Sequence, residues 1–249
     1  SPRQLPRQVA APRGVSHLSP PPPTGQPMHA ALHERWLTLA RRLAVPEAVA
    51  ARYWTDLSSR YSEPHRFYHT LEHLADMMAL ADASARVIED REAVELAIWF
   101  HDAVYDVPSP PGQNEDRSAE LFRAFAADAG CLRPDTVRAV AAWIEQTKHH
   151  RCESADPPDC RLFMDLDMAV LSRAPADYDA YARQVRAEHR HVWAPFFWWG
   201  RARFLARLAA GTAPVYHTEA FRGAREAAAR ANVAREAAGL RARIAAASC

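Results

Sequence analysis

The sequence has few cysteines and no long apolar run. The four cysteines are widely separated and form no Cys-x-x-Cys pair; they are Cys131, Cys152, Cys160 and Cys249. This spacing argues against a disulfide framework and a thiolate zinc site, and it favours a reducing compartment. The longest strongly apolar stretch, residues 96–100, is far shorter than the roughly 20 residues of a membrane-spanning helix. We therefore expect a cytoplasmic protein that does not span a membrane.

The chain also lacks a large net charge of either sign. Lys and Arg number 31 and Asp and Glu number 30, which gives a formal charge of +1, and Lys148 is the only lysine. This balance argues against a general polyanion binder, so a nucleic-acid partner is not expected. With 49% hydrophobic and 24% charged residues, the composition is that of an ordinary globular protein.

Residues 1–27 contain little that could be buried. They include many prolines, among them the run Pro20 to Pro23, and almost no periodic apolar positions. Because proline lacks a backbone donor and the segment offers no core, we predict that it is disordered. It has no apolar stretch typical of a secretory signal. One hypothesis is that Met28 is the natural start; residues 28–249 are predicted to form a single helical domain.

Beyond this segment, apolar positions recur with helical spacing. Leu32, Trp36 and Leu39, for example, share one face of a predicted helix. Helices are predicted over about residues 29–43, 46–61, 69–85, 91–103, 115–129, 134–148, 161–171, 175–192, 195–209 and 218–246. No convincing β-type alternation occurs, so we predict an all-α bundle of nine to ten helices. The last helix could pack on the bundle or on a second subunit, which leaves a homodimer open.

Histidine and aspartate gather in three separate segments. His69 and His73 are four residues apart, so they share a face if the helix has begun by His69. His101 and Asp102 close an apolar run, and buried ionisable groups of this kind need a partner or a metal.

The third segment holds Asp165 and Asp167, of which at most one is expected to point fully inward. Imidazole and carboxylate ligands from three helices suit divalent Mn, Fe, Co, Ni or Zn, as one ion or two. Such an ion would lower the pKa of a bound water and make hydroxide available near neutral pH.

The ordered set His73, His101-Asp102, Asp167 resembles the signature of the HD superfamily of metal-dependent phosphohydrolases. Five runs resemble, more narrowly, a bacterial branch of predicted HD phosphohydrolases; they are residues 66–73, 99–106, 114–119, 147–150 and 165–171. The resemblance extends over about residues 29–240. It implies a helical HD fold and a metal-activated water that hydrolyses a small phosphorylated substrate of the nucleotide kind.

Two related groups sharpen the roles. The run Tyr68-His69-x-x-x-His73 is similar to the YHN-x-x-H run of cyclic nucleotide phosphodiesterases, in which the first His is the general acid and the second binds metal. The resemblance implies that His69 protonates the leaving oxygen and that His73 is a ligand, although Thr70 stands where that group has Asn. A structural cap or a supporting hydrogen bond is the alternative role for His69.

The run that begins at His101 is similar to the HDTVED run of the stringent-response alarmone hydrolases. Asp106 then matches an acidic residue near the attacking water, and a cap or supporting hydrogen bond is again the alternative. Tyr105 replaces the preceding Glu of that run, which argues against a simple transfer of the alarmone substrate.

The resemblance also orders the remaining ligand candidates. It favours Asp167 as the last ligand and keeps Asp165 as the alternative. His150 matches a recurrent His of the narrower branch and could serve a second metal, whereas His149 is a weaker candidate.

Four residues could bind or orient the substrate: Asn114, Glu115, Arg117 and Lys148. A phosphoryl group needs compensating cations, but a solvated helix face is the alternative for the charged three. Asn114 could simply cap a helix that begins at Glu115. The aromatic residues within 193–199 are interpreted as a core or subunit contact, and residues 186–191 as an exposed helix with internal charge pairing.

Two other functions fit parts of this pattern. A two-iron oxygenase of the HD fold needs four histidines around its irons, which His73, His101, His149 and His150 could only just supply. A regulatory module would retain the metal or the nucleotide pocket without turnover.

Overall fold

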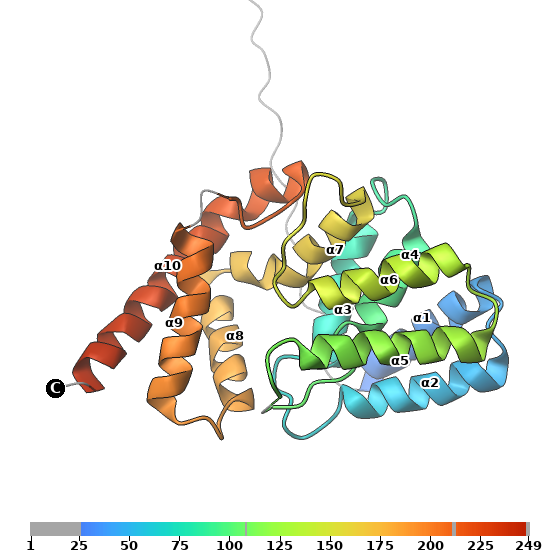
Figure 1. Cartoon of the computed structure of the whole chain (residues 1–249), viewed down its shortest axis with the longest axis horizontal. Coiled ribbons are helices and arrows are strands. Elements are labelled where there is room, and N and C mark those ends of the chain that lie inside the picture. Colours follow the sequence, from blue (N-terminus) through green and yellow to red (C-terminus); the bar gives the residue numbers. More distant parts are fainter. Residues whose placement is uncertain (1–25, 108, 211–212, 248–249) are drawn as a thin grey trace, which may run out of the picture.

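The computed structural model describes residues 26–107, 109–210 and 213–247. Within these ranges the chain forms ten α-helices, a short 3-10 helix and no strand, which confirms the predicted all-α class (Figure 1). The elements are α1 (Gln26–Arg42), α2 (Glu47–Arg60), α3 (Leu71–Ala83), α4 (Arg91–Phe100), α5 (Gln113–Ala129), α6 (Pro134–Gln146), α7 (Pro158–Met168), η1 (Ala169–Ser172), α8 (Pro175–Glu188), α9 (Ala194–Ala210) and α10 (Glu219–Ala247).

The segment for which disorder is predicted, residues 1–27, lies outside the described residues except for its last two positions, which begin α1. None of the helices in the described ranges combines the length and the apolar character that a membrane crossing requires.

Helix α4 lies at the centre of the first seven helices. Every residue from Ala93 to Phe100 is buried, and the helix contacts α3, α5, α6 and α7. A helix covered on all sides has no polar face, which explains its nearly continuous apolar sequence. Its one buried charge, Glu95, is paired with Arg35 at 3.0 Å and Arg91 at 2.8 Å. These pairs satisfy the carboxylate inside the bundle.

An aromatic cluster fixes the last turn of α4. The Trp36 ring of α1 lies 5.6 Å from that of Trp99 and 5.5 Å from that of Phe125 on α5. The indole N–H of Trp36 donates to the carbonyl oxygen of Ala50 on α2 at 2.8 Å. Buried aromatic pairs contribute about 0.5 to 1.5 kcal/mol each beyond their buried area. The residues that follow α4 therefore leave a rigid part of the core.

Helix boundaries near the site differ from the predicted ones. Helix α3 begins at Leu71, because the side chain of Thr70 caps it by accepting the backbone N–H of Glu72 at 3.3 Å. His69 thus lies in the turn before the helix, and the condition for a shared helical face with His73 is not met. Helix α4 ends at Phe100, three residues before its predicted end, so His101 and Asp102 follow it.

The last three long helices gather at one side of the molecule, where Figure 1 shows α8, α9 and α10 beside the rest of the bundle. Helix α10 packs along α9 and against η1. Of the two alternatives left open for the last helix, packing on its own chain is therefore observed. The homodimer stays a prediction.

Candidate metal centre and its cavity

Two histidines and two aspartates converge where α3, α4 and α7 meet. His73 lies in the first turn of α3, His101 and Asp102 directly follow α4, and Asp167 lies in the last turn of α7. One potential ligand atom from each residue lies within 4.8 Å of all the others. The Nε2 atom of His73 is 3.2 Å from that of His101 and 3.1 Å from Asp167 Oδ1. The structure thus brings four of the predicted ligands into one cluster.

The donor atoms fit a divalent ion. Bonds of about 2.1 Å place adjacent ligands of one ion roughly 3.0 to 3.4 Å apart, which matches the contacts of His73 and the 3.0 Å separation of His101 Nε2 from Asp102 Oδ2. The Nδ1 atom of His101 is 2.9 Å from the carbonyl oxygen of Ile98, which can only accept a hydrogen bond. In the neutral ring Nδ1 therefore carries the proton, and the lone pair of Nε2 faces the cluster.

The two carboxylates require positive charge at the centre. Burial raises the pKa of Asp167, but hydrogen bonds with His101 and His150 hold that pKa well below its ordinary range. Burial lowers the pKa of His101, yet Asp102 and Asp167 raise it well above its ordinary value. An imidazolium can supply this charge, and a divalent ion supplies it equally while leaving both imidazoles neutral, as ligands must be.

Arg66 ties together the two loops that carry the site. Its side chain is buried, and its Nη1 atom donates to the carbonyl oxygens of Asp102 at 2.6 Å and His69 at 3.2 Å. Nη2 donates to the carbonyl oxygen of Ala103 at 3.1 Å, and Nε pairs with Glu63 at 2.9 Å. Arg66 lies in the run that carries His69, but no local sequence feature predicted a role for it.

The side chain of Glu188, at the end of α8, is fully buried. The interpretation of residues 186–191 as an exposed helix is therefore wrong at this position. Oε1 accepts the backbone N–H groups of Phe67, Tyr68 and His69 at 2.7 to 3.0 Å. Oε2 lies 2.8 Å from His69 Nδ1 and accepts the hydroxyl of Tyr105 at 3.0 Å. One carboxylate therefore fixes both the backbone and the ring of His69.

His69 and Glu188 each stabilise the charged form of the other. Burial raises the pKa of Glu188, but the charge of His69 and the hydrogen bonds with it lower that pKa to about 2. Burial lowers the pKa of His69, but Glu188 and then Asp102 raise it above its ordinary value. The Tyr105 ring stacks on the imidazole at 4.2 Å between centroids. The His69 Nε2 atom lies 4.0 Å from Asp102 Oδ2, beside the metal cluster.

His150 extends the cluster on the far side of Asp167. Its Nε2 atom is 2.7 Å from Asp167 Oδ2, and its carbonyl oxygen lies 3.1 Å from His217 Nε2. The backbone of His150 has φ of 48°, in the left-handed region that non-glycine residues seldom adopt. The role of His150 at a second ion stays a prediction. His149 is exposed, and its Nδ1 lies 2.8 Å from the carbonyl oxygen of Gln146.

Asp165 lies apart from the cluster of His73, His101, Asp102 and Asp167. Its carboxylate is fully buried and accepts the backbone N–H of His217 at 2.6 Å, together with the backbone N–H and hydroxyl of Thr218 at 2.8 and 2.6 Å. It thereby holds the chain that enters α10. Of the two candidate aspartates, Asp167 is the one in the metal cluster.

A cavity of about 220 Å³ opens over the cluster. The polar side chains of its wall are those of Tyr68, His69, Asp102, Tyr105, Asn114, Glu115, Thr147, His150, Asp167, Tyr181, His189 and Arg201. His73 and His101 are buried beneath it, whereas Asp102 and Asp167 keep 18% and 13% of their side chains exposed. Solvent therefore reaches the cluster from its carboxylate side.

The other predicted site residues lie at the rim or outside. Asp106 is largely exposed and pairs with Arg117, and neither is among the residues that line the described cavity. Asn114 does not cap a helix at Glu115, because α5 begins earlier, after Gly112. Its amide instead bridges the backbone N–H and carbonyl of Asp106 at 3.1 and 2.9 Å.

Lys148 also lies outside the described cavity wall. Its ammonium group pairs with Asp116, and its side chain lies across Gly112. Gly112 has φ of +85°, and a Cβ there would come within 3.3 Å of Lys148 Cδ. Because Lys148 is paired with Asp116, its positive charge is already compensated.

Arg201 of α9 is a cation of the cavity wall that was not predicted from the sequence. It lines the cavity, and its Nε and Nη2 atoms pair with Glu236 at 3.0 and 3.2 Å. Nη1 lies 3.3 Å from the hydroxyl of Tyr181. Phe197 and Phe204 lie four residues before and three after Arg201, which places the arginine on the apolar face of α9. This spacing could have predicted from the sequence that Arg201 is partly buried.

The chain matches no protein-family model, and no curated protein is similar to it. The all-helical fold and the buried His and Asp cluster are nevertheless consistent with an HD-like arrangement.

Proposed function

We propose that the chain is a metal-dependent phosphohydrolase of the HD type that acts on a small phosphoester. The observation that carries the proposal is the position of His69. This proton-transfer group lies beside the four-residue metal cluster, on the wall of the same cavity, and a buried carboxylate orients it. Metal ligands, a general acid and a cation around one open site are the parts that phosphoester hydrolysis requires.

His73, His101, Asp102 and Asp167 would hold the ion. A divalent ion supplies hydroxide by lowering the pKa of a bound water, and it neutralises charge on the phosphoryl oxygens. In the reaction a water oxygen bonds to phosphorus and the bond from phosphorus to the leaving oxygen breaks.

His69 supplies the proton for the leaving oxygen. With Nδ1 hydrogen-bonded to Glu188, the ring presents Nε2 toward the cluster. Glu188 and Asp102 raise the pKa of His69 above its ordinary value, which favours the protonated ring that a general acid needs. After the transfer, the neutral ring keeps its proton on Nδ1, which donates a hydrogen bond to Glu188. The orientation of His69 is therefore preserved.

Arg201 offers a charge-assisted hydrogen-bond donor to a bound phosphoryl group, while Glu236 compensates its charge. Nε and Nη2 are held by Glu236, so Nη1 retains donor capacity beyond its contact with Tyr181. The cavity, at about 220 Å³, is smaller than the roughly 300 to 1,000 Å³ of typical ligand pockets. Its size favours a compact substrate such as a mononucleotide over an alarmone.

A combined metal and turnover assay tests this proposal. Metal content of the purified chain is measured by mass spectrometry, and phosphate release is screened over nucleotides and simple phosphoesters with Mn, Co, Ni, Fe, Zn and Mg. His101→Ala and Asp102→Ala should each lose bound metal and reduce turnover by at least about 100-fold. His149→Ala is the matched control, because this exposed histidine lies outside the cluster.

Full turnover in folded His101→Ala and Asp102→Ala proteins would refute the proposal. Bound iron with oxygen consumption and no phosphate release would instead favour the two-iron oxygenase. Bound metal with neither activity would favour a regulatory module.

A further inference from the structure

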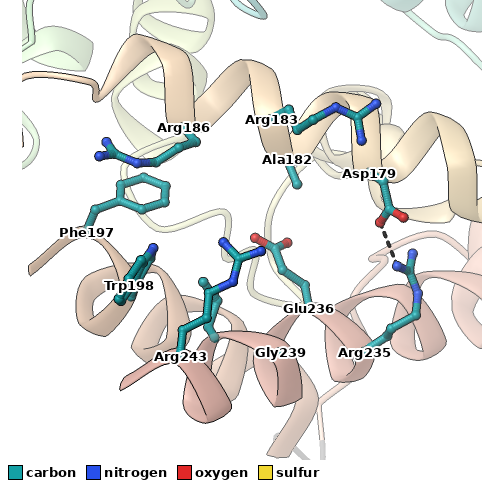
Figure 2. Close-up of a pocket in the computed structure, with 11 residues that line it drawn as sticks. Asp179, Ala182, Arg183, Arg186, Phe197, Trp198, Arg235, Glu236, Gly239 and Arg243 are labelled. Atoms are coloured by element: carbon teal, nitrogen blue, oxygen red, sulfur yellow. Dashed lines mark hydrogen bonds and ion pairs between the residues drawn. The ribbon is translucent and has the colours of Figure 1, made fainter. Parts of the chain in front are cut away.

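A second, larger hollow lies between α8, α9 and α10, and we call it the C-terminal groove. Its volume is about 460 Å³. It is lined by Asp179, Ala182, Arg183 and Arg186 of α8, by Phe197 and Trp198 of α9, and by Arg235, Glu236, Gly239, Leu240 and Arg243 of α10. Figure 2 shows Arg183 and Arg186 on the helix above the groove and Arg243 reaching upward from the helix below it.

The groove has an excess of positive charge. Asp179 is paired with Arg235 at 2.6 Å, and Glu236 is held by Arg201 and by the Tyr178 hydroxyl at 2.5 Å. Both acidic groups of the wall are therefore already engaged.

Three arginines of the groove wall have no acidic partner among the described residues: Arg183, Arg186 and Arg243. Arg186 donates only to the carbonyl oxygens of His189 and Val192, at 2.5 and 3.2 Å, so its charge is oriented but not neutralised. Cations on both sides of a hollow attract a ligand with several negative charges.

The aromatic wall adds a flat surface beside these cations. The Arg186 guanidinium covers the Phe197 ring at 4.8 Å from its centroid. Trp198 is half-buried, and within the described residues its indole has no ring or cation partner. The exposed part of this indole lies beside arginines, so it can stack a planar ring while the arginines bind the charged group of the same ligand.

We propose that the C-terminal groove is a second binding site, separate from the metal cavity, and that it takes a nucleoside polyphosphate. The base stacks on Trp198, and the phosphates lie between Arg183, Arg186 and Arg243. Its volume falls within the usual range for a ligand of this size. A mononucleotide rather than a nucleic acid fits a bounded hollow on a chain with a net charge of +1.

The groove and the metal cavity share a wall. Glu236 lines the groove, and its carboxylate holds Arg201, which lines the metal cavity. A polyphosphate that draws Arg243 and Arg186 together changes the electrostatic potential at the Glu236 carboxylate. This change alters the strength of the ion pair between Glu236 and Arg201. Occupancy of the groove should therefore alter substrate affinity in the metal cavity, a consequence that rests on the proposed function.

Calorimetric titration of the full chain with ATP in EDTA tests the binding site without any metal at the cluster. ATP should bind at least about tenfold more tightly than adenosine or tripolyphosphate, because each of these lacks one half of the contacts. The double variant Arg183→Gln/Arg243→Gln should weaken ATP binding by about tenfold or more.

Gly239 offers a steric test. A Cβ at Gly239 meets nothing within 4 Å, so Gly239→Leu places a side chain in the groove without disturbing the protein, and leucine favours the helix. This variant should lose ATP binding. Gly223→Leu is the matched control, since Gly223 lies on the same helix with equally open space and does not line the described groove.

His101→Ala separates this site from the metal cavity and should bind ATP with unchanged affinity in EDTA. The proposal is overturned if folded wild-type protein does not bind ATP at millimolar concentration. It is also overturned if Gly239→Leu and the double arginine variant bind ATP normally, if tripolyphosphate binds as tightly as ATP, or if a short oligonucleotide binds more tightly. None of these outcomes depends on turnover, so failure of the phosphohydrolase proposal remains distinguishable.

Discussion

At the residue scale, charged side chains on apolar helix faces organise the site. Glu188 shares its face of α8 with Tyr181 and Val185, seven and three residues earlier, and all three are buried. A buried carboxylate is tolerated only with compensating donors, and three backbone N–H groups, a tyrosine hydroxyl and His69 supply them. The same logic applies to Arg201 on α9. Such residues orient side chains that line the cavity.

Glu188→Gln should separate positioning of His69 from metal binding. The amide keeps the size of the side chain but removes the charge that orients His69 and raises its pKa, so turnover should fall by about 10- to 100-fold with metal content unchanged. Glu226→Gln is the matched control, because this carboxylate also accepts backbone N–H groups, at Val215 and Tyr216, away from the cavity. Equal turnover losses in both variants would contradict the positioning role.

The pH dependence of stability provides a second test of the Glu188 variant. Because the pKa of Glu188 is lowered to about 2 from an ordinary value of 4.5, its charge stabilises the fold fully above about pH 4.5. That contribution is lost as pH falls toward 2. The unfolding free energy of wild type should therefore exceed that of Glu188→Gln above pH 4.5 and approach it at lower pH, as measured by urea denaturation. A gap that widens on acidification would refute this assignment.

At the element scale, the ends of helices rather than their interiors build the site. Thr70 starts α3, the aromatic core fixes the end of α4, and Arg66 joins the loops next to both. Each loop keeps carbonyl groups that an intrahelical partner does not satisfy, and the fork of one guanidinium reaches three of them.

Arg66→Lys should therefore loosen two elements at once. A lysine ammonium cannot reproduce the fork, and the buried carbonyl groups would lose donors, so the free energy of unfolding should fall by about 2 to 4 kcal/mol. Chemical denaturation without added metal measures the loss. Arg60→Lys is the control, because its half-exposed pair with Asp56 should contribute only about 0.3 to 0.5 kcal/mol. Similar losses in both variants would refute the role of Arg66.

At the scale of the whole molecule, the cluster of His73, His101, Asp102 and Asp167 exists only in the folded chain. Its ligands come from α3, α7 and the end of α4, and His73 is separated from Asp167 by nearly 100 positions (Figure 1). An ion that binds the folded chain and not the unfolded one adds its binding energy to stability.

Divalent metal should therefore raise the melting temperature. At 100 times the dissociation constant the gain is about 2.7 kcal/mol, which corresponds to a rise of about 5 to 10 °C for a chain of this size. Differential scanning fluorimetry with Mn or Zn, reversed by EDTA, measures the shift. His101→Ala should show none and His149→Ala the full shift. An equal shift in both variants would place the stabilising ion elsewhere.

The sequence by itself determined the helical class and most helix positions, because apolar periodicity and helix-ending residues are local properties. The predicted and observed helices agree within about three residues at most boundaries. The order of His73, His101, Asp102 and Asp167, through its resemblance to the HD signature, also indicated the four residues that the fold brings into one cluster.

Only the tertiary structure decided which groups act on these ligands. Glu188 is more than 100 residues from His69, and Arg201 reaches the cavity from α9, a helix for which the sequence predicted no site residue. Tertiary structure also placed Asp165 away from the cluster and Asp106 on the surface. Local sequence sets which face of a helix is apolar, but the partner of a buried charge depends on contacts between distant segments, which periodicity does not encode.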